Sequence, residues 1–183
     1  MNQSPQVPGP VLDLGCGPNK TAGAWGVDHH PYPGVDQVLD LDSVDWPLPA
    51  GHFSEIHASH VIEHVASIPA FMREIRRIAA PGALVRITTP HYTSIDSWTD
   101  PTHRWHLACG WHETFTQGDS YLGAQLTGFE HVSTELTFRR GLRNAIPKLM
   151  IRVKGMLWYE KNNAFRYPAR NIHTVLKVVA ALP

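Results

Sequence analysis

The first residues that could do chemistry follow a short apolar run, Val11–Leu14, near the start of the chain. Gly15 and Gly17 come directly after it, with Cys16 between them. An apolar run that breaks into closely spaced glycines is typical of a buried parallel strand followed by a tight loop. Glycine suits such a loop because a Cβ would block positive φ angles and a close approach of the backbone to a ligand. The pattern predicts a ligand-binding turn, and an ordinary turn is the alternative.

A second set of candidate residues lies in a segment rich in histidine and tryptophan, residues 90–118. Its length and irregularity are typical of an active-site lid. His91 and His103 are candidate general bases, because imidazole titrates near neutral pH, and Asp100 could orient a histidine or balance its charge. The same side chains could instead hold the loop together without taking part in a reaction. The tryptophans of this segment could stack on an acceptor or form the loop's own small core.

Metal chemistry is a weaker alternative. Residues His60–His64 read H-x-x-E-H, a pattern that some zinc proteases carry on one face of a helix. Here the pattern directly follows a predicted strand, which disfavours a protease. A site built from His103, His106 and His112 is also disfavoured, because no cysteine or carboxylate completes a recognisable ligand set. We therefore assign no residue to a metal.

The elements that must position these residues begin with four short apolar runs. Several of the runs end on or just before Asp or Ser, and such polar strand ends lie where a doubly wound sheet binds its ligand. The four predicted strands are Val11–Leu14, Ala24–Asp28, Val35–Leu39 and Phe53–Ser59.

A change of period marks one helix. Apolar residues recur at spacings of three and four up to Ile78, which predicts an amphipathic helix with Ser67 as its N-cap and Pro81-Gly82 at its end. A strand over Ala83–Thr89 follows, and a strand–helix–strand unit with short connections implies a right-handed parallel crossover. With late strands near residues 129–138 and 172–180, the pattern predicts an α/β fold with a doubly wound, mostly parallel sheet.

Composition limits the number of domains, the classes of partner and the cellular compartment that we expect. The chain has 183 residues, of which 43% are hydrophobic, so we expect a single domain over residues 1–183 with a flexible N-terminus at residues 1–9. Lys plus Arg and Asp plus Glu are equal at 16 each, so the chain has no net positive charge that would favour binding to nucleic acid. Two distant cysteines predict no disulfide framework. Neither a signal peptide nor a transmembrane segment is expected, which favours a cytoplasmic protein. The oligomeric state stays open.

Residues 139–159 form a basic segment that also carries aliphatic and aromatic side chains. The favoured interpretation is a solvated helix whose apolar face packs on the sheet. Contact with an anionic membrane surface or with an acidic acceptor is the alternative.

Several motifs together resemble those of class I S-adenosylmethionine-dependent methyltransferases, in particular the small, single-domain, methyltransferase type 11-like members. The resemblance implies a Rossmann-like fold, S-adenosylmethionine as cofactor and S-adenosylhomocysteine as product. Asn19 replaces the family's third glycine, and the next strand begins soon afterwards, so we expect a shortened first crossover helix. The motifs, in order, are D-L-G-C-G at 13–17, G-V-D at 26–28, D-L at 40–41, S-H-V-I-E-H-V at 59–65 and P-G-A-L-V-R-I at 81–87.

The resemblance also implies cofactor-binding roles for residues at the tips of the first four strands. Asp28 would accept two hydrogen bonds from the ribose, although it could simply begin a turn. Asp40 with Leu41 would contact the adenine amine, and Asp42 or Asp45 could substitute. The implied cofactor residues are Asp13, Gly15, Cys16, Gly17, Asp28, His29, Asp40, Leu41, Ser59, His60 and His64.

The implied reaction is methyl transfer to a small-molecule or glycan acceptor, with oxygen as the expected acceptor atom. The glycan association rests on residues 100–104, D-P-T-H-R, which resemble a run in a subgroup often encoded near glycan-modifying enzymes. His91 or His103 would be the base, with Asp100 beside it. A non-catalytic binding module with the same fold is the alternative, and a metal-dependent hydrolase is a more distant one.

Overall fold

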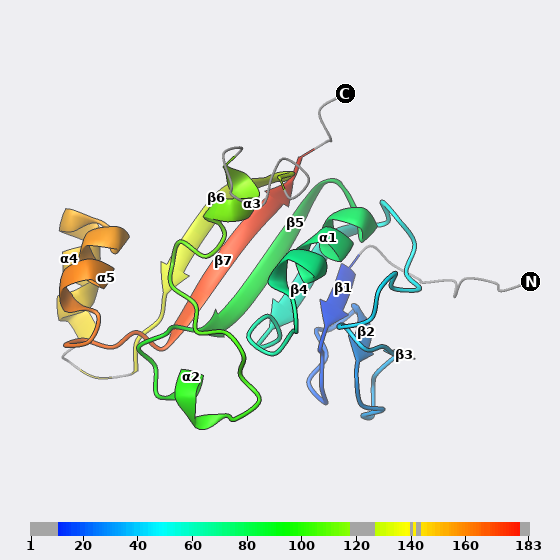
Figure 1. Ribbon diagram of the computed structural model, residues 1–183, viewed down its shortest axis with the longest axis horizontal. Coiled ribbons are helices and arrows are strands. Elements are labelled where there is room, and N and C mark those ends of the chain that lie inside the picture. Colours follow the sequence, from blue (N-terminus) through cyan, green and yellow to red (C-terminus); the bar gives the residue numbers. More distant parts are fainter. Residues whose placement is uncertain (1–10, 118–126, 140, 142–143, 180–183) are drawn as a thin grey trace, which may run out of the picture.

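The structure, a computed structural model, describes residues 11–117, 127–139, 141 and 144–179 (Figure 1). The predicted flexible segment at residues 1–9 lies outside this range. The fold is built on a seven-stranded sheet. Its strands are β1 (Val11–Leu14), β2 (Trp25–Asp28), β3 (Gln37–Val38), β4 (Phe53–Ser59), β5 (Ala79–Pro90), β6 (Phe129–Leu136) and β7 (Asn171–Val178).

The sheet is mostly parallel and reverses its winding direction at the centre. Its order is β3-β2-β1-β4-β5-β7-β6, and only β7 runs antiparallel to its neighbours β5 and β6. The chain winds from β1 out to β3 and then returns to β4 on the other side of β1. This reversal leaves a crevice outside the carboxyl ends of β1 and β4. The predicted doubly wound sheet is confirmed.

Helix α1 (Ile68–Ile78) lies over one face of the sheet (Figure 1). Ser67 is its N-cap, as predicted, and Ser67 Oγ accepts a hydrogen bond from the backbone N–H of Ala70 at 3.3 Å. The helix ends at Ile78 rather than at Pro81, because Ala79 already has the extended values φ −73° and ψ 137°. Residues 81 and 82 instead lie inside β5, where the pairing with β4 changes register.

Loops replace the crossover helices after β1, β2 and β3, and all three connections are among the described residues. The expected shortening of the first crossover helix is therefore confirmed, and it extends to the next two connections. The loop after β3 buries Trp46 and Leu48 in the core. Arg77 of α1 holds this loop by donating to the carbonyl oxygens of Trp46 at 2.7 Å and Leu48 at 3.1 Å.

The second half of the chain adds two short helices, α2 (Asp96–Thr99) and α3 (Glu113–Thr116), and then α4 (Ala145–Lys154) and α5 (Met156–Asn163). α4 and α5 connect β6 to β7, contact each other and lie at one end of the molecule, away from α1 (Figure 1). The expectation that the apolar face of the basic segment packs on the sheet is wrong for α4, where Pro147 is the buried residue. No helix in the described part of the chain is long and apolar enough to span a bilayer.

Candidate active site

A cleft of about 750 Å³ lies outside the strand tips that the winding reversal brings together. This volume is in the range of small-molecule and cofactor sites. The cleft gathers most of the residues predicted to bind the cofactor, namely Gly15, Asp28, His29, Asp40, Leu41, His60 and His64. It is also lined by Asp42, the alternative to Asp40 at the adenine amine. Six further lining residues had no predicted cofactor role: His30, Tyr32, Val61, Val65, Thr102 and Arg104.

The glycine loop after β1 has the backbone that its sequence requires. Gly15 and Gly17 have φ values of 62° and 53°, in the left-handed region that favours glycine. A Cβ at Gly15 would lie 2.4 Å from Cγ2 of Val61, which belongs to the turn after β4. Glycine at this position therefore lets the two strand tips approach each other and form the floor of the cleft.

Asp13 and Cys16 support this loop rather than line the cleft. Asp13 is buried, and its Oδ2 accepts the backbone N–H of Thr21 at 2.7 Å. Cys16 packs beside Gly26, where an added Cβ would lie 2.8 Å from the Cys16 sulfur. Burial, helped by the nearby Asp13 and Asp28 carboxylates, raises the pKa of the Cys16 thiol to about 11, so the thiol is not a nucleophile near neutral pH.

Asp28, at the end of β2, keeps the capacity to bind a ribose. Its Oδ2 accepts the backbone N–H of Gly17 and its Oδ1 accepts that of His30, both at 2.9 Å. Because a carboxylate can accept about four hydrogen bonds in total, each oxygen retains room for one more donor. A vicinal diol, which presents two hydroxyl donors, fits that remaining capacity. The residues present therefore fit the cofactor that the sequence implies.

The opposite wall of the cleft is tied to the loop after β3. Asp42 Oδ1 accepts the backbone N–H of Ala66 at 2.7 Å, and its Oδ2 lies 3.4 Å from the Arg104 guanidinium. Asp40 uses one oxygen to accept the Asp42 backbone N–H at 2.9 Å and is exposed at the cleft. This arrangement favours Asp40 over Asp42 as the acid beside an adenine amine.

His60 follows β4 and faces the cleft beside a buried acid. Its backbone has φ 57°, and its side chain is 45% exposed. Nδ1 of His60 lies 3.2 Å from Oε1 of Glu63, which is fully buried, and Oε2 of Glu63 accepts the Thr89 hydroxyl at 3.0 Å. An ionised carboxylate only accepts hydrogen bonds, so this contact places the proton of a neutral imidazole on Nδ1 and leaves Nε2 as the basic atom.

Glu63 also links β4 to the lid segment. Its backbone carbonyl accepts the N–H groups of Arg104 at 2.8 Å and Trp105 at 3.2 Å. Residues 60–66 form turns rather than a helix, so the H-x-x-E-H pattern does not have the geometry of a zinc protease. Ser59, another predicted cofactor residue, is exposed at the end of β4, and neither Ser59 nor Gly17 is part of the cleft lining.

His103 lies behind the cleft wall. Its Nδ1 is 3.0 Å from the Ser97 carbonyl oxygen, and its Nε2 is 3.8 Å from Oδ2 of Asp100. Hydrogen bonds from the side chain and backbone of Thr102 hold the pKa of Asp100 below its ordinary value. His64 packs against His103, with ring centroids 4.6 Å apart.

Glu63, His64 and His103 each offer an atom within 4.8 Å of the others, so together they could hold a divalent cation.

His91, the other predicted base, is fully buried and does not face the cleft. Its Nδ1 accepts the Thr93 backbone N–H at 3.2 Å, so its Nε2 carries the proton shared with Oε1 of Glu160 at 2.9 Å. Burial acts to raise the pKa of Glu160, but the bonds from His91 and from the Cys109 backbone N–H outweigh it and lower that pKa. His91 thus links the start of the lid segment to α5, which argues against a role as general base.

The other histidines and the tryptophans of the lid segment have structural partners. His106 stacks on Trp98 at 3.6 Å and His112 on His131 at 4.2 Å, so the set of His103, His106 and His112 does not converge. The indole N–H groups bond to oxygens of the chain. These pairs are Trp98 with Tyr92 O, Trp105 with Val65 O and Trp111 with Thr174 Oγ1. A second cluster of possible metal ligands consists of His91, Cys109 and Glu160, in which Glu160 already accepts hydrogen bonds from both His91 and Cys109.

Comparison with known proteins identifies the family. The family model described as a methyltransferase domain matches residues 2–134, and the chain belongs to this family. It is a class I S-adenosylmethionine-dependent methyltransferase, so its cofactor is S-adenosylmethionine and its product is S-adenosylhomocysteine. No curated protein matches it in sequence.

Several solved structures share the fold at low sequence identity. An S-adenosylmethionine-dependent methyltransferase from Archaeoglobus fulgidus is 18% identical with a TM-score of 0.63, over 91% of this chain and 85% of that one. One from Mesorhizobium loti is 16% identical with a TM-score of 0.57, over 91% and 89%. The YcgJ protein from Bacillus subtilis is 12% identical with a TM-score of 0.58, over 94% and 92%.

Proposed function

We propose that this methyltransferase transfers a methyl group to an oxygen atom of a small-molecule or glycan acceptor, with His60 as the general base. The observation that carries the proposal is the pairing of His60 with the buried Glu63 at the tip of β4. The pair lies in the same cleft as Asp28, which has the remaining acceptor capacity for a ribose. The glycan part of the proposal rests on the resemblance of residues 100–104, which contribute to the cleft wall.

The chain's own residues have a limited task in this reaction. The cofactor supplies a methyl group that is already activated on a sulfonium, so positioning of the acceptor provides much of the rate. His60 Nε2 takes the proton of the acceptor hydroxyl as the new O–CH₃ bond forms and the S–CH₃ bond breaks. The buried Glu63 carboxylate, held by Thr89, stabilises the imidazolium that results.

His103 with Asp100 is the second candidate pair for the base. Its Nδ1 bond to the Ser97 carbonyl also leaves Nε2 unprotonated, and Thr102 and Arg104 on either side of it line the cleft. Its side chain is nearly buried, however, whereas that of His60 is open to the cleft. An acceptor would reach His103 only after the wall moved, which favours His60.

The cofactor site is tested by titration calorimetry with S-adenosylmethionine and S-adenosylhomocysteine. We expect micromolar binding to the wild type and roughly 10–100-fold weaker binding to Asp28→Ala, because charge-assisted hydrogen bonds to the ribose are lost. Glu130→Ala removes an exposed acid on β6 and should bind like the wild type. Equal affinity of Asp28→Ala and the wild type would show that the ribose lies elsewhere.

A further inference from the structure

Helices α4 and α5 expose aliphatic side chains at helical spacing. Ile146, Leu149 and Val153 lie three and four residues apart and form one stripe on α4. Leu149 is 61% exposed, Val153 66% and, on α5, Leu157 62%. Ile146 of the stripe, Trp158 of α5 and Phe165, which follows α5, are also exposed. Scattered exposed apolar residues are normal, but a cluster rimmed by charges marks an interaction surface.

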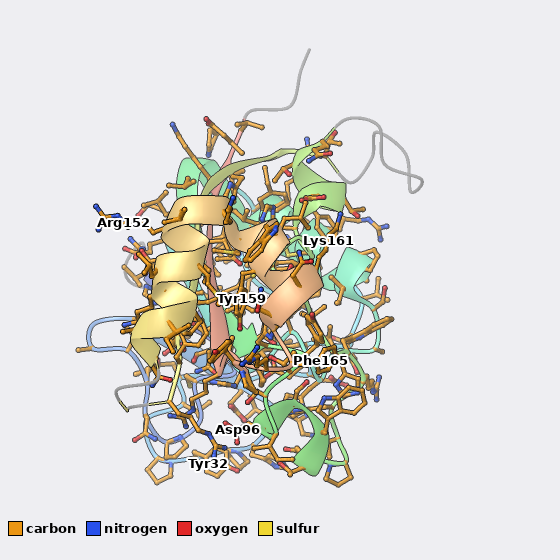
Figure 2. The ribbon with its side chains drawn as sticks, turned by 90° about the vertical axis from the view of Figure 1, so that its left-hand side faces the viewer. Tyr32, Asp96, Arg152, Tyr159, Lys161 and Phe165 are labelled. Atoms are coloured by element: carbon orange, nitrogen blue, oxygen red, sulfur yellow. The ribbon has the colours of Figure 1, made fainter. Side chains whose placement is uncertain are left out.

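The way α5 is anchored explains which side remains open. Tyr159 is fully buried, its ring contacts Phe138, and its hydroxyl donates to the Tyr167 carbonyl. Glu160 is bound to His91. These contacts direct Tyr159 and Glu160 inward, so Leu157 and Trp158 point outward. Figure 2 shows Tyr159 between the two helices, with Arg152 to one side and Lys161 to the other.

The charge on this surface has one sign. Glu160 is the only acid between residues 139 and 170, and it is engaged inside the molecule with His91. The exposed cations on and beside the two helices are Lys148, Arg152, Lys154, Lys161 and Arg166. Their long side chains can lie along the apolar stripe and keep the charge in a polar layer above it. The surface is therefore both apolar and cationic.

A hollow of about 380 Å³ adjoins the helices and extends the positive charge. It is lined by Asn144, the residue before α4, and by three exposed arginines, Arg139, Arg166 and Arg170. Asp96 is the acid that partly offsets them, at 3.6 Å from Arg139 and 3.4 Å from Arg170. Planar guanidinium groups in such a hollow match the oxygens of a phosphate.

We propose that α4, α5 and the adjoining arginine hollow, here called the basic end, bind the anionic surface of a lipid bilayer. The apolar stripe would enter the boundary between headgroups and acyl chains, and the cations would contact lipid phosphates. This contact is separate from the cofactor cleft, and its test does not depend on the methyl acceptor.

A second copy of the chain fits the basic end less well. A two-fold contact presents the same patch on both subunits, so it would bring the cations of one copy against those of the other. An anionic bilayer supplies the opposite charge and receives apolar side chains without a matching groove. Charge complementarity thus favours lipid over self-association.

The test is co-sedimentation of the full chain with vesicles. We expect binding to vesicles of phosphatidylcholine mixed with phosphatidylglycerol, and little binding to phosphatidylcholine alone. Binding should fall as salt is raised, and inorganic phosphate at the same total concentration should not displace the protein. Leu149→Asp/Val153→Asp and, separately, Lys148→Gln/Arg152→Gln should each weaken binding by roughly tenfold or more.

Val44→Asp is the matched control, because Val44 is 85% exposed in the loop after β3, outside the basic end. Calorimetry with S-adenosylhomocysteine reports whether each variant keeps the affinity of its parent and is therefore folded. The proposal is overturned if the wild type ignores anionic vesicles, binds both vesicle types equally, or binds as well after either double substitution. It is also overturned if sedimentation velocity shows a dimer that Leu149→Asp/Val153→Asp separates while no vesicle binding occurs.

Discussion

At the scale of single residues, histidines of the same type serve different purposes because their partners differ. His60 has one nitrogen on a buried carboxylate and the other toward the cleft. His91 has both nitrogens engaged inside the molecule, and His103 has one on a backbone carbonyl. Which nitrogen is free decides which residue can take a proton. His60 is the histidine that combines a fixed tautomer with an open position.

Replacing His60 and His103 separately distinguishes the two candidate bases. With radiolabelled S-adenosylmethionine and the best acceptor from a screen of sugars and phenols, His60→Gln should lower kcat by about 100-fold or more. The acid limb of its kcat/KM profile against pH should disappear, while cofactor affinity measured by calorimetry stays at the wild-type level. His103→Gln should change kcat far less. If His103→Gln lost most of its kcat while His60→Gln kept the acid limb of its kcat/KM profile, the general base would be His103 rather than His60.

At the scale of elements, loops take the place of the crossover helices that usually connect neighbouring parallel strands. The loop after β3 buries Trp46 and Leu48, and α1 holds it through Arg77 and Glu74. The hydrogen bonds and charge of Arg77 outweigh burial and lower the pKa of Glu74, which also accepts the Trp46 backbone N–H at 2.9 Å. This loop continues from Asp40 and Leu41, so its packing also sets one wall of the cleft.

Arg77→Ala tests this attachment. Two backbone carbonyls and the Glu74 carboxylate lose a charged donor, so the free energy of unfolding should fall by about 2–3 kcal/mol. Urea denaturation followed by circular dichroism measures the change, and the affinity for S-adenosylhomocysteine should also decrease because the loop carries Asp40. Arg73→Ala, at an exposed position of the same helix, should cost less than about 0.5 kcal/mol. Similar losses in both variants would mean that the loop is held by Trp46 and Leu48 alone.

The elements also show what the sequence could and could not predict. Periodicity identified β4, α1 and the strand tips that carry Asp28 and His60, because burial repeats locally along the chain. The predicted end of α1 at Pro81-Gly82 lies beyond the observed end at Ile78, because these two residues belong to β5, where its pairing with β4 is irregular. The partners of Glu63 and His91 were not predictable: Thr89 and Glu160 lie far along the chain, and only the fold brings them together.

At the scale of the whole molecule, the two halves of the chain carry different tasks. The first half builds the cleft that we propose binds the cofactor, at the tips of β1, β2 and β4, and Thr102 and Arg104 contribute to one wall of it. The second half completes the sheet with β6 and β7 and places α4 and α5 at one end (Figure 1). The two parts join through buried histidines, His91 on Glu160 of α5 and His112 on His131 of β6. Burial lowers the pKa of His112 to about 4, which makes the junction with His131 sensitive to acid.

His112 should make stability depend on pH between about 6.5 and about 4. Burial, with a smaller contribution from His131, lowers its pKa from 6.5 to about 4, and its Nδ1 has no partner among the described residues. Below pH 6.5 the His112 imidazole is protonated in the unfolded chain, whereas in the folded chain it stays neutral down to about pH 4. The contribution of the neutral imidazole to stability is therefore fully present above pH 6.5 and is lost as the pH drops toward 4, by at most on the order of 3 kcal/mol.

Urea denaturation at pH 7.5, 6.5, 5.5 and 4.5 measures this dependence, since the carboxylates with lowered pKa values, such as Glu74, lose their contribution only at lower pH. His112→Leu should flatten the slope between pH 6.5 and 4.5, whereas His52→Gln, at an exposed position, should not. Some slope should remain in His112→Leu, because burial also lowers the pKa of His173 on β7. A slope in His112→Leu as steep as that of the wild type would mean that this imidazole is hydrated in solution and that the contact between the lid segment and β6 is open.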